Sequence, residues 1–288
     1  MKKLICIILF VVLLCGCTPS QEFNIIATTC PVYTFTERLC EGTGITVGQL
    51  LTENVSCLHD YTLKVRQMQM LEQADAVAIN GAGLEDFLED ALCGTNGVID
   101  ASKGLDLLEN TNGHHEHHDG HMHGEDPHIW LSPRNAKVMA ENICNSMCVL
   151  YPDHAHTIQA NLTSLLSDLD ALQAYGEEAL VDISSRELVT FHDGFSYLAE
   201  SFGLTILEAV EEESGSEVSA KQLISLVTLV QEHHLPAIFT ETNGSVSAAN
   251  IIAAEAGVPI YTLDMGISGK DYFDMMYHNI DTLREALN

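Results

Sequence analysis

The sequence has few basic residues and, beyond its first twenty positions, no long hydrophobic run. Its 288 residues include 12 Lys and Arg against 41 Asp and Glu, which gives a formal net charge of −29. A nucleic-acid binder needs a basic face for phosphate contacts, so this charge argues against that class and against docking on anionic lipid by charge. No later stretch of 18 apolar residues occurs, so no further segment is predicted to span a bilayer.

Two common zinc signatures are also missing. No cysteines are spaced as CxxC, which argues against a cysteine-based zinc knuckle, and no HExxH pair marks a helical zinc hydrolase. Histidine is abundant instead, with 14 residues, in a chain that is 46% apolar and 18% charged. That composition is typical of a globular chain with one large domain or two medium ones.

The amino terminus has the pattern of an export signal. A short basic start precedes the apolar run Leu4–Leu14, whose 11 residues are too few to span a bilayer as a helix. The run leads to Cys17 and a polar linker, which resembles a bacterial lipobox; an ordinary signal peptide containing cysteines is the alternative. We therefore expect a signal peptide at 1–16, a lipid on Cys17, and an extracytoplasmic chain anchored to a bacterial membrane, at the cell surface or in the periplasm.

Six cysteines would remain after processing, apart from the one that carries lipid. An oxidising compartment would allow them to form disulfides, whose pairing the sequence leaves open. They are Cys30, Cys40, Cys57, Cys93, Cys144 and Cys148.

Short apolar runs alternate with helical patterns along the rest of the chain. This alternation predicts parallel sheets and an α/β class. The expected strands form two groups of four: 23–29, 44–51, 76–80 and 97–100, then 187–192, 204–210, 237–242 and 258–264. Shorter helices are expected at 63–73, 84–92, 196–202, 220–233 and 247–256.

A long helical stretch separates the two groups. Ser132 is a predicted N-cap with Pro133 at the first helical position, and after a break near Tyr151 a second stripe runs from Asp153 to about Leu180. That second helix would be roughly 28 residues, or about 42 Å, long enough for the height of a two-lobed protein. We expect two lobes, 17–150 and 184–288, each with a roughly four-stranded parallel sheet flanked by helices, and a linking helix within 151–183.

Residues 109–125 differ from the rest of the first lobe. The segment is rich in histidine and acids and has no apolar periodicity, which predicts a low-complexity loop. It could bind extra zinc weakly through overlapping ligand sets, or it could be an inert spacer. Its histidines are His114, His115, His117, His118, His121 and His123.

Polar residues stand at the ends of three expected strands in the second half. His192, Glu241 and Asp264 each close a strand, and ligands of open α/β sheets bind at the carboxyl edge of the strands. In the first half, His59 comes shortly after the strand that ends near Leu51, and His128 comes just before the helix capped by Ser132. Imidazole nitrogens with one carboxylate make a good tetrahedral zinc set.

Each of these residues also has a structural interpretation. A lone histidine at a strand end is commonly a surface or capping residue, Asp264 could belong to a turn, and Glu241 could hold a histidine instead of touching metal. The other histidines outside the loop are expected on helix faces or helix ends: His154, His156, His233, His234 and His278.

Several sequence blocks carry a family resemblance. They are Ile25–Tyr33, His59–Leu63 with Met70–Glu85, Asp126–Pro133, Thr190–Leu198, Phe239–Glu241 and Thr262–Gly266. Through them nearly the whole mature chain resembles the zinc-binding solute-binding lipoproteins of metal ABC transporters, the cluster A-I family. The departures are Val65 and Val218, where proline is usual, and Leu58, where some relatives carry a coordinating acid.

The resemblance implies a site and a function. His59, His128 and His192 would bind Zn²⁺, with Asp264, water or a nearby acid in the fourth place, and the linking helix would be rigid. The protein would be a monomer and not an enzyme, and would deliver Zn²⁺ to an ABC permease with its ATPase. A manganese carrier would be expected to have two histidines and two carboxylates, so His192 is the discriminating residue. A zinc-dependent hydrolase, with Glu241 as acid–base group, and an adhesion or metal-buffer module remain the alternatives.

Overall fold

The computed structural model describes residues 23–53, 58, 61–109, 124–211, 218–242, 244, 246–269 and 271–288. Several sequence predictions fall outside this part of the chain. They concern the export signal with Cys17, the ligand candidate His59, Cys57 and the six histidines of the loop.

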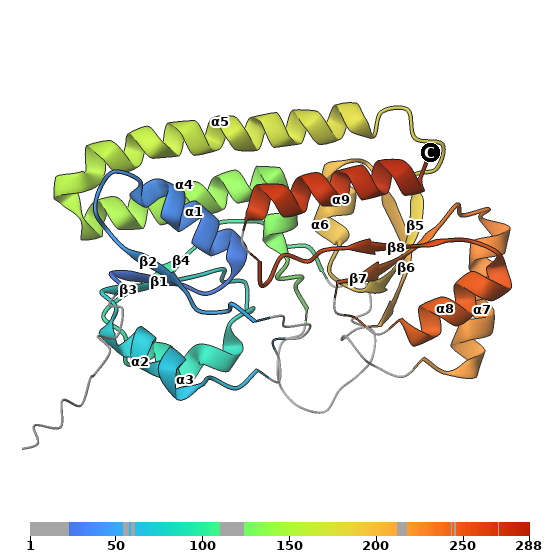
Figure 1. Ribbon diagram of the computed structural model, residues 1–288, viewed down its shortest axis with the longest axis horizontal. Coiled ribbons are helices and arrows are strands. Elements are labelled where there is room, and N and C mark those ends of the chain that lie inside the picture. The colour runs from blue at the N-terminus through green and yellow to red at the C-terminus, as the bar shows by residue number, and fades with distance from the viewer. Residues whose placement is uncertain are drawn as a thin grey trace, which may run out of the picture.

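The first sheet contains four parallel strands in the order β2-β1-β3-β4. They are β1 (Ile25–Ala27), β2 (Val47–Gln49), β3 (Ala76–Ile79) and β4 (Val98–Asp100). All four lie within the ranges expected from the sequence. Helices α1 (Cys30–Cys40) and α4 (Pro133–Leu150) cover one face, whereas α2 (Val65–Gln73), a 3-10 turn (Asp86–Leu88) and α3 (Glu89–Leu92) cover the other (Figure 1).

The second sheet repeats this arrangement with the order β6-β5-β7-β8, again all parallel. Its strands are β5 (Glu187–His192), β6 (Thr205–Glu211), β7 (Ile238–Glu241) and β8 (Ile260–Leu263). Helices α7 (Ala220–Glu232) and α8 (Ser247–Ala256) pack on one face, and α6 (Ser196–Ser201) and α9 (Tyr272–Ala286) on the other. Because β5 and β7 are neighbours, His192 and Glu241 end adjacent strands.

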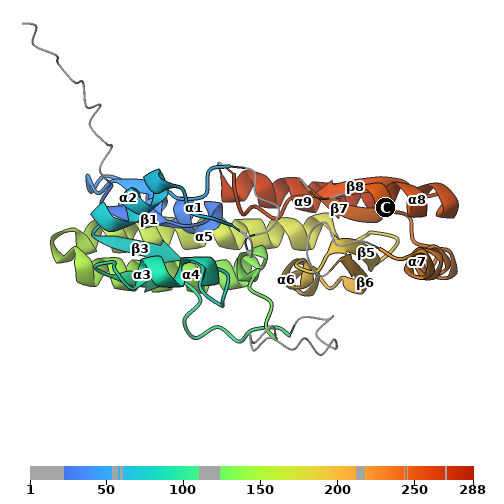
Figure 2. The same cartoon turned by 90° about the horizontal axis from the view of Figure 1, so that it is seen from below.

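Helix α5 (Ala155–Ala179) links the two sheets and lies along both lobes (Figures 1 and 2). Its 25 residues correspond to about 37 Å at 1.5 Å per residue. The buried stripe Ile158, Leu165, Leu169 and Leu172 faces the core, and a Cβ on Gly176 would lie only 2.2 Å from the Phe202 ring. The long linking helix expected from the sequence is therefore confirmed, and glycine lets it approach the second lobe closely.

Hydrogen bonds confirm the predicted cap at Ser132 and show a second serine cap at Ser219. The Ser132 hydroxyl accepts from the Asn135 amide at 3.4 Å, with Pro133 at the first position of α4. The Ser219 hydroxyl accepts from the Gln222 amide at 3.3 Å at the start of α7. None of the described helices is long and apolar enough to cross a membrane.

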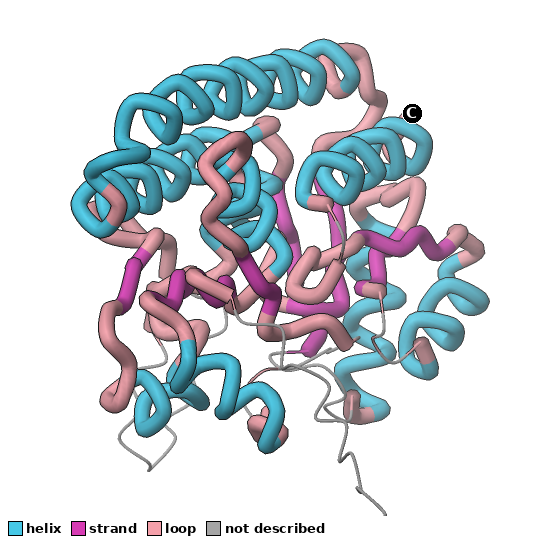
Figure 3. Tube along the Cα trace, turned by 60° about the vertical axis from the view of Figure 1, so that its left-hand side comes forward, coloured by secondary structure: helices cyan, strands magenta, loops and turns pink. Residues whose placement is uncertain are grey.

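The chain also contains two helices that the sequence interpretation did not include, α1 and α9. Helix α9 follows β8 but begins against the first lobe, where Tyr272 packs edge-on to Phe35 with ring centroids 4.9 Å apart. The Cys30 amide donates to the Ile267 carbonyl at 3.0 Å in the segment leading to it. The lobes are thus joined twice, by α5 and by this returning segment, and the strands of both sheets lie below α5 and α9 in Figures 1 and 3.

Candidate metal centre

His128 is held in a defined orientation by Asp126. One carboxylate oxygen, Oδ1 of Asp126, accepts from both the His128 backbone amide at 2.9 Å and its ring Nδ1 at 2.7 Å. Asp126 is completely buried and His128 is only 8% exposed. A carboxylate can only accept, so Nδ1 carries the proton and Nε2 offers its lone pair. This is the arrangement that orients a metal-binding histidine.

His192 meets His128 from the other lobe. It ends β5, and its ring centroid lies 5.3 Å from that of His128 with the two rings nearly perpendicular, at 86°. The second lobe therefore contributes an imidazole beside that of the first.

Gly194 lies against both rings. A Cβ at this position would lie 2.8 Å from Nδ1 of His128, 2.8 Å from Cδ2 of His192 and 2.7 Å from Cε of Met265. A side chain would therefore push the imidazoles apart. The close approach of the two histidines depends on glycine here.

Two acids stand near this pair in different environments. Glu241 is 4% exposed, and its Oε2 lies 3.8 Å from Nδ1 of His192, too far for a direct hydrogen bond. Asp264 follows β8, and its Oδ1 accepts from the Gly266 amide at 2.8 Å. The backbone of Asp264 is also fixed, because its amide donates to Asn279 at 2.8 Å and its carbonyl accepts from Asn279 at 2.7 Å.

The segment that carries His128 is fixed from several sides. The Asn80 amide group donates to the Pro127 carbonyl at 3.0 Å, and the Tyr197 hydroxyl donates to the Asp126 carbonyl at 3.0 Å. The Trp130 indole donates to the Met265 carbonyl at 2.8 Å, next to Asp264. These bonds connect the His128 segment to both lobes and to the segment of Asp264.

The structure thus brings together some of the predicted site residues. His128 and His192 are in ring contact, Glu241 is beside His192, and Asp264 adjoins Met265, which contacts Gly194. Within the described ranges, no three His, Cys, Asp or Glu side chains gather closely enough to hold a metal ion. The roles of His59, His128, His192 and Asp264 as metal ligands all stay predictions.

The other described histidines lie where the sequence placed them, at helix faces and ends. His156 and His278 are within α5 and α9, and His154, His233 and His234 are at helix termini. His233 lies 2.9 Å from a Glu187 carboxylate oxygen on an exposed surface.

Three residues of the centre were not singled out from the sequence. Asp126 was recognisable only as part of a motif, although its position two residues before His128 is compatible with a carboxylate that bonds the ring. Gly194 and Trp130 gave no such signal, because their contacts join segments far apart in the chain.

Comparison with known proteins gives a consistent family. The family model described as zinc-uptake complex component A, periplasmic, matches residues 25–286. The zinc-binding protein AdcA of Streptococcus pyogenes serotype M3 is 30% identical over an alignment covering 91% of this chain and 56% of that protein. The chain therefore spans about half the length of the curated relatives it matches.

Solved structures agree in fold. A crystal structure of ZnuA superposes with a TM-score of 0.82 at 27% identity, covering 93% of this chain and 100% of that one. The Zn(II)-bound ZnuA-like domain of Streptococcus pneumoniae AdcA gives a TM-score of 0.76 at 27% identity, covering 92% of this chain and 99% of that domain.

Proposed function

Because the chain belongs to the zinc-uptake complex component A family, we propose that it captures Zn²⁺ outside the cytoplasmic membrane and delivers it to an ATP-driven transporter. Zn²⁺ is the cargo of this protein, and the permease with its ATPase is the partner. The chain acts as a monomer, anchored to the membrane by lipid on Cys17. The name of its relative in Streptococcus pneumoniae, zinc-binding lipoprotein AdcA, supports the anchor.

The observation that carries the proposal is the pair of imidazoles supplied by different lobes. His128 and His192 lie with ring centroids 5.3 Å apart, and Asp126 leaves Nε2 of His128 available for a cation. With His59 as a third imidazole, this donor set favours Zn²⁺ over harder ions such as Mn²⁺, which suit carboxylate and water oxygens. Binding between lobes would also couple the cation to their relative position.

The fourth position is assigned to Asp264. Its Oδ1 is engaged by the Gly266 amide, so Oδ2 is the atom that would face a cation. Glu241 is assigned to orienting His192, because its Oε2 lies on the side of Nδ1. That leaves Nε2 of His192 for the metal, as for His128.

The His-rich segment 109–125 is proposed to gather zinc weakly beside the tight site. Its first and last residues, Glu109 and Glu125, pair in an antiparallel bridge, and the Asp126 amide donates to the Leu108 carbonyl at 2.7 Å. Both ends of the segment therefore meet directly before His128. Its low-complexity sequence predicts that ordering the segment around a cation would cost about 1–2 kcal/mol per residue, so its affinity should be lower than that of the interlobe site.

Calorimetric zinc titration tests the proposal on four forms of the chain: the full chain, a chain lacking residues 113–124, and the latter with His128→Ala or His156→Ala. Deletion should lower the number of zinc ions bound but keep one tight ion. In that shortened chain, His128→Ala should lower the affinity for the tight ion by more than the roughly 10–100-fold typical of replacing an orienting residue. His156→Ala is the matched control, since His156 is exposed on α5.

Two results would contradict the assignment. Unchanged tight binding in His128→Ala, with the variant folded by circular dichroism, would make His128 structural. Loss of the tight ion on deletion of residues 113–124 would move the principal site into the loop.

A further inference from the structure

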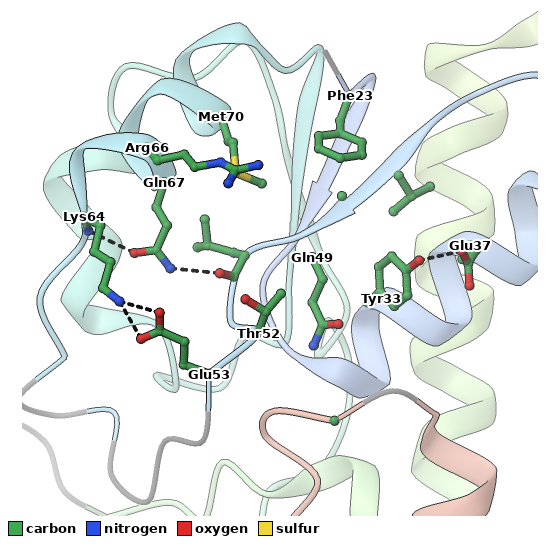
Figure 4. Close-up of a pocket in the computed structure, with 14 residues that line it drawn as sticks. Phe23, Tyr33, Glu37, Gln49, Thr52, Glu53, Lys64, Arg66, Gln67 and Met70 are labelled. Atoms are coloured by element: carbon green, nitrogen blue, oxygen red, sulfur yellow. Dashed lines mark hydrogen bonds and ion pairs between the residues drawn. The ribbon is translucent and has the colours of Figure 1, made fainter. Parts of the chain in front are cut away.

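One cavity among the described residues lies away from the metal centre, along the outer edge of the first sheet. It encloses about 780 Å³ and is open to solvent. Its floor is strand β2 with the residues that follow, and its sides come from α1 and α2 (Figure 4). This edge groove is lined by Gln49 of β2, with Tyr33 on one side and Arg66 and Met70 on the other.

The strand that forms the floor has one unpaired edge. β2 is the terminal strand of the sheet and pairs only with β1 in the described part of the chain. The Ile25 amide donates to the Thr46 carbonyl and the Leu50 amide donates to the Ala27 carbonyl, so Gly48 between them faces β1 as well. Val47 and Gln49 consequently direct their backbone amides and carbonyls outward, into the edge groove.

The two sides of the edge groove present different surfaces to an added strand. A Cβ on Gly48 would lie 2.7 Å from Phe23, which packs with Met70 in the cluster under α2. Val47 and Tyr33 belong instead to the cluster on the α1 side. Side chains of an added strand would alternate between these two sides.

One of the two basic side chains in the edge groove has no ion pair with a described residue. Lys64 is paired with Glu53, and the Tyr33 hydroxyl donates to Glu37 (Figure 4). Arg66, which lies beside Met70 in Figure 4, makes no hydrogen bond or ion pair with any described residue. Arg66 is exposed beside the open edge of the sheet, and without an ion pair to any described residue it can donate to a carboxylate of a partner.

We propose that the edge groove binds an extended peptide segment of another protein, which adds to β2 as a further strand and directs an acidic side chain to Arg66. Main-chain hydrogen bonds to Val47 and Gln49 would supply affinity, as in other cases of strand addition to a sheet edge. The carboxylate on the α2 side and apolar contacts with Phe23 and Met70 would supply selectivity. This inference is independent of the proposed zinc site.

The test uses a fluorescein-labelled, acetylated peptide of sequence Val-Glu-Val-Glu-Val-Glu-Val and the full chain. Fluorescence anisotropy should show saturable binding. Two control peptides should bind at least about tenfold more weakly. One carries lysine in place of each glutamate, and the other is N-methylated on alternate residues. A tenfold loss is the effect of removing one or two good hydrogen bonds. Hydrogen exchange should slow at the Val47 and Gln49 amides and stay unchanged at Gly48, which already faces β1.

Two variants separate the backbone contacts from the charge. Val47→Pro removes an outward-facing amide but no hydrogen bond to β1. Proline is tolerated at such a position of an edge strand. Arg66→Glu reverses the exposed charge. Each should weaken peptide binding at least about tenfold, whereas Lys221→Glu on the exposed start of α7 should have no effect.

Three results would overturn the proposal. The first is no saturable binding to the full chain. The second is undiminished binding by folded Arg66→Glu. The third is a concentration-dependent dimer in sedimentation that Val47→Pro abolishes, because this would show that a second copy of the chain occupies the edge.

Discussion

Individual carboxylates in this protein do different work according to what surrounds each oxygen. Asp126 uses one oxygen to fix both the backbone and the ring of His128. Asp264 has one oxygen bound to Gly266, and Glu241 stands 3.8 Å from Nδ1 of His192. The residue type alone therefore does not separate an orienting acid from a metal ligand, and the partners of each acid have to be compared.

Replacing these acids by their amides should distinguish their roles. Asp264→Asn keeps an oxygen for the Gly266 amide but removes the charge of the proposed ligand, so zinc affinity should fall by more than the roughly 100-fold upper limit expected of an orienting residue. Glu241→Gln should lower it by roughly 10–100-fold, as expected of an orienting residue. Cobalt substitution provides the readout, since only Asp264→Asn should change the ligand-field spectrum. Equal spectra with equal affinities for both variants would contradict the assignment.

Glu85 is a buried acid outside the metal centre. It is 5% exposed, and its carboxylate accepts from the Thr28 hydroxyl at 2.6 Å and from the Asn80 and Gly81 amides at 2.7 and 3.0 Å. Burial nonetheless raises the pKa of Glu85 to about 7, and the nearby Asp100 charge raises it further in the same direction. The folded protein therefore holds this proton more tightly than the unfolded chain does.

This shift predicts a pH-dependent stability. The stabilisation from Glu85 is complete below the unfolded pKa near 4.5 and is lost as pH rises through about 7. Urea unfolding of the metal-free chain should therefore show the difference between wild type and Glu85→Gln changing by roughly 2–3 kcal/mol from about pH 4.5 to 8. The exposed Glu89→Gln is the control, and a difference for Glu85→Gln that is independent of pH would disprove the linkage.

At the scale of secondary structure, the sequence predicted all eight strands, because each is a short apolar run bounded by turns or helices. Several predicted ranges were longer than the paired segments, as for β1 and β2, which have three residues each because pairing with neighbours sets their ends, whereas the range for β5 was correct. The long helix was predicted well because its apolar stripe repeats at helical spacing.

The two missed helices differ in how visible they are in the sequence. In α1, eight of 11 residues are buried, including threonines and cysteines, so no single apolar stripe stands out. In α9 the buried residues recur every three or four positions with only Asn279 polar among them, so this helix had a local signal that was missed. The contacts of both helices with the long helix and across the lobes cannot be derived from local periodicity.

The same limit applies to the metal centre. The rule that ligands gather at the carboxyl ends of parallel strands was enough to select His192, Glu241 and Asp264. The contact of His128 with His192 depends on how the lobes meet, and on a glycine between the rings. Those features come from packing of distant segments and had no separate sequence signal.

For the molecule as a whole, the important feature is that the lobes are joined on two sides. Helix α5 spans both, and the segment from Asp264 to Tyr272 returns to the first lobe. Trp130 is the centre of the second connection: its indole donates to the Met265 carbonyl at 2.8 Å, and its carbonyl accepts from the Tyr272 hydroxyl at 2.9 Å. Two connections limit wide hinge opening, so cargo release should involve small lobe shifts and local rearrangement.

Tyr272→Phe tests whether this second connection holds the site together. The hydroxyl is fully buried, so its removal leaves the Trp130 carbonyl without that donor and should lower the free energy of unfolding by about 1–3 kcal/mol. Because Trp130 also holds the segment beside Asp264, zinc should dissociate faster into a chromophoric chelator in stopped-flow measurements. Tyr261→Phe removes a surface hydroxyl that donates to Glu285 at 3.4 Å and should change stability by less than about 0.5 kcal/mol. If Tyr272→Phe loses stability but releases zinc at the wild-type rate, the connection supports the fold without controlling the cargo.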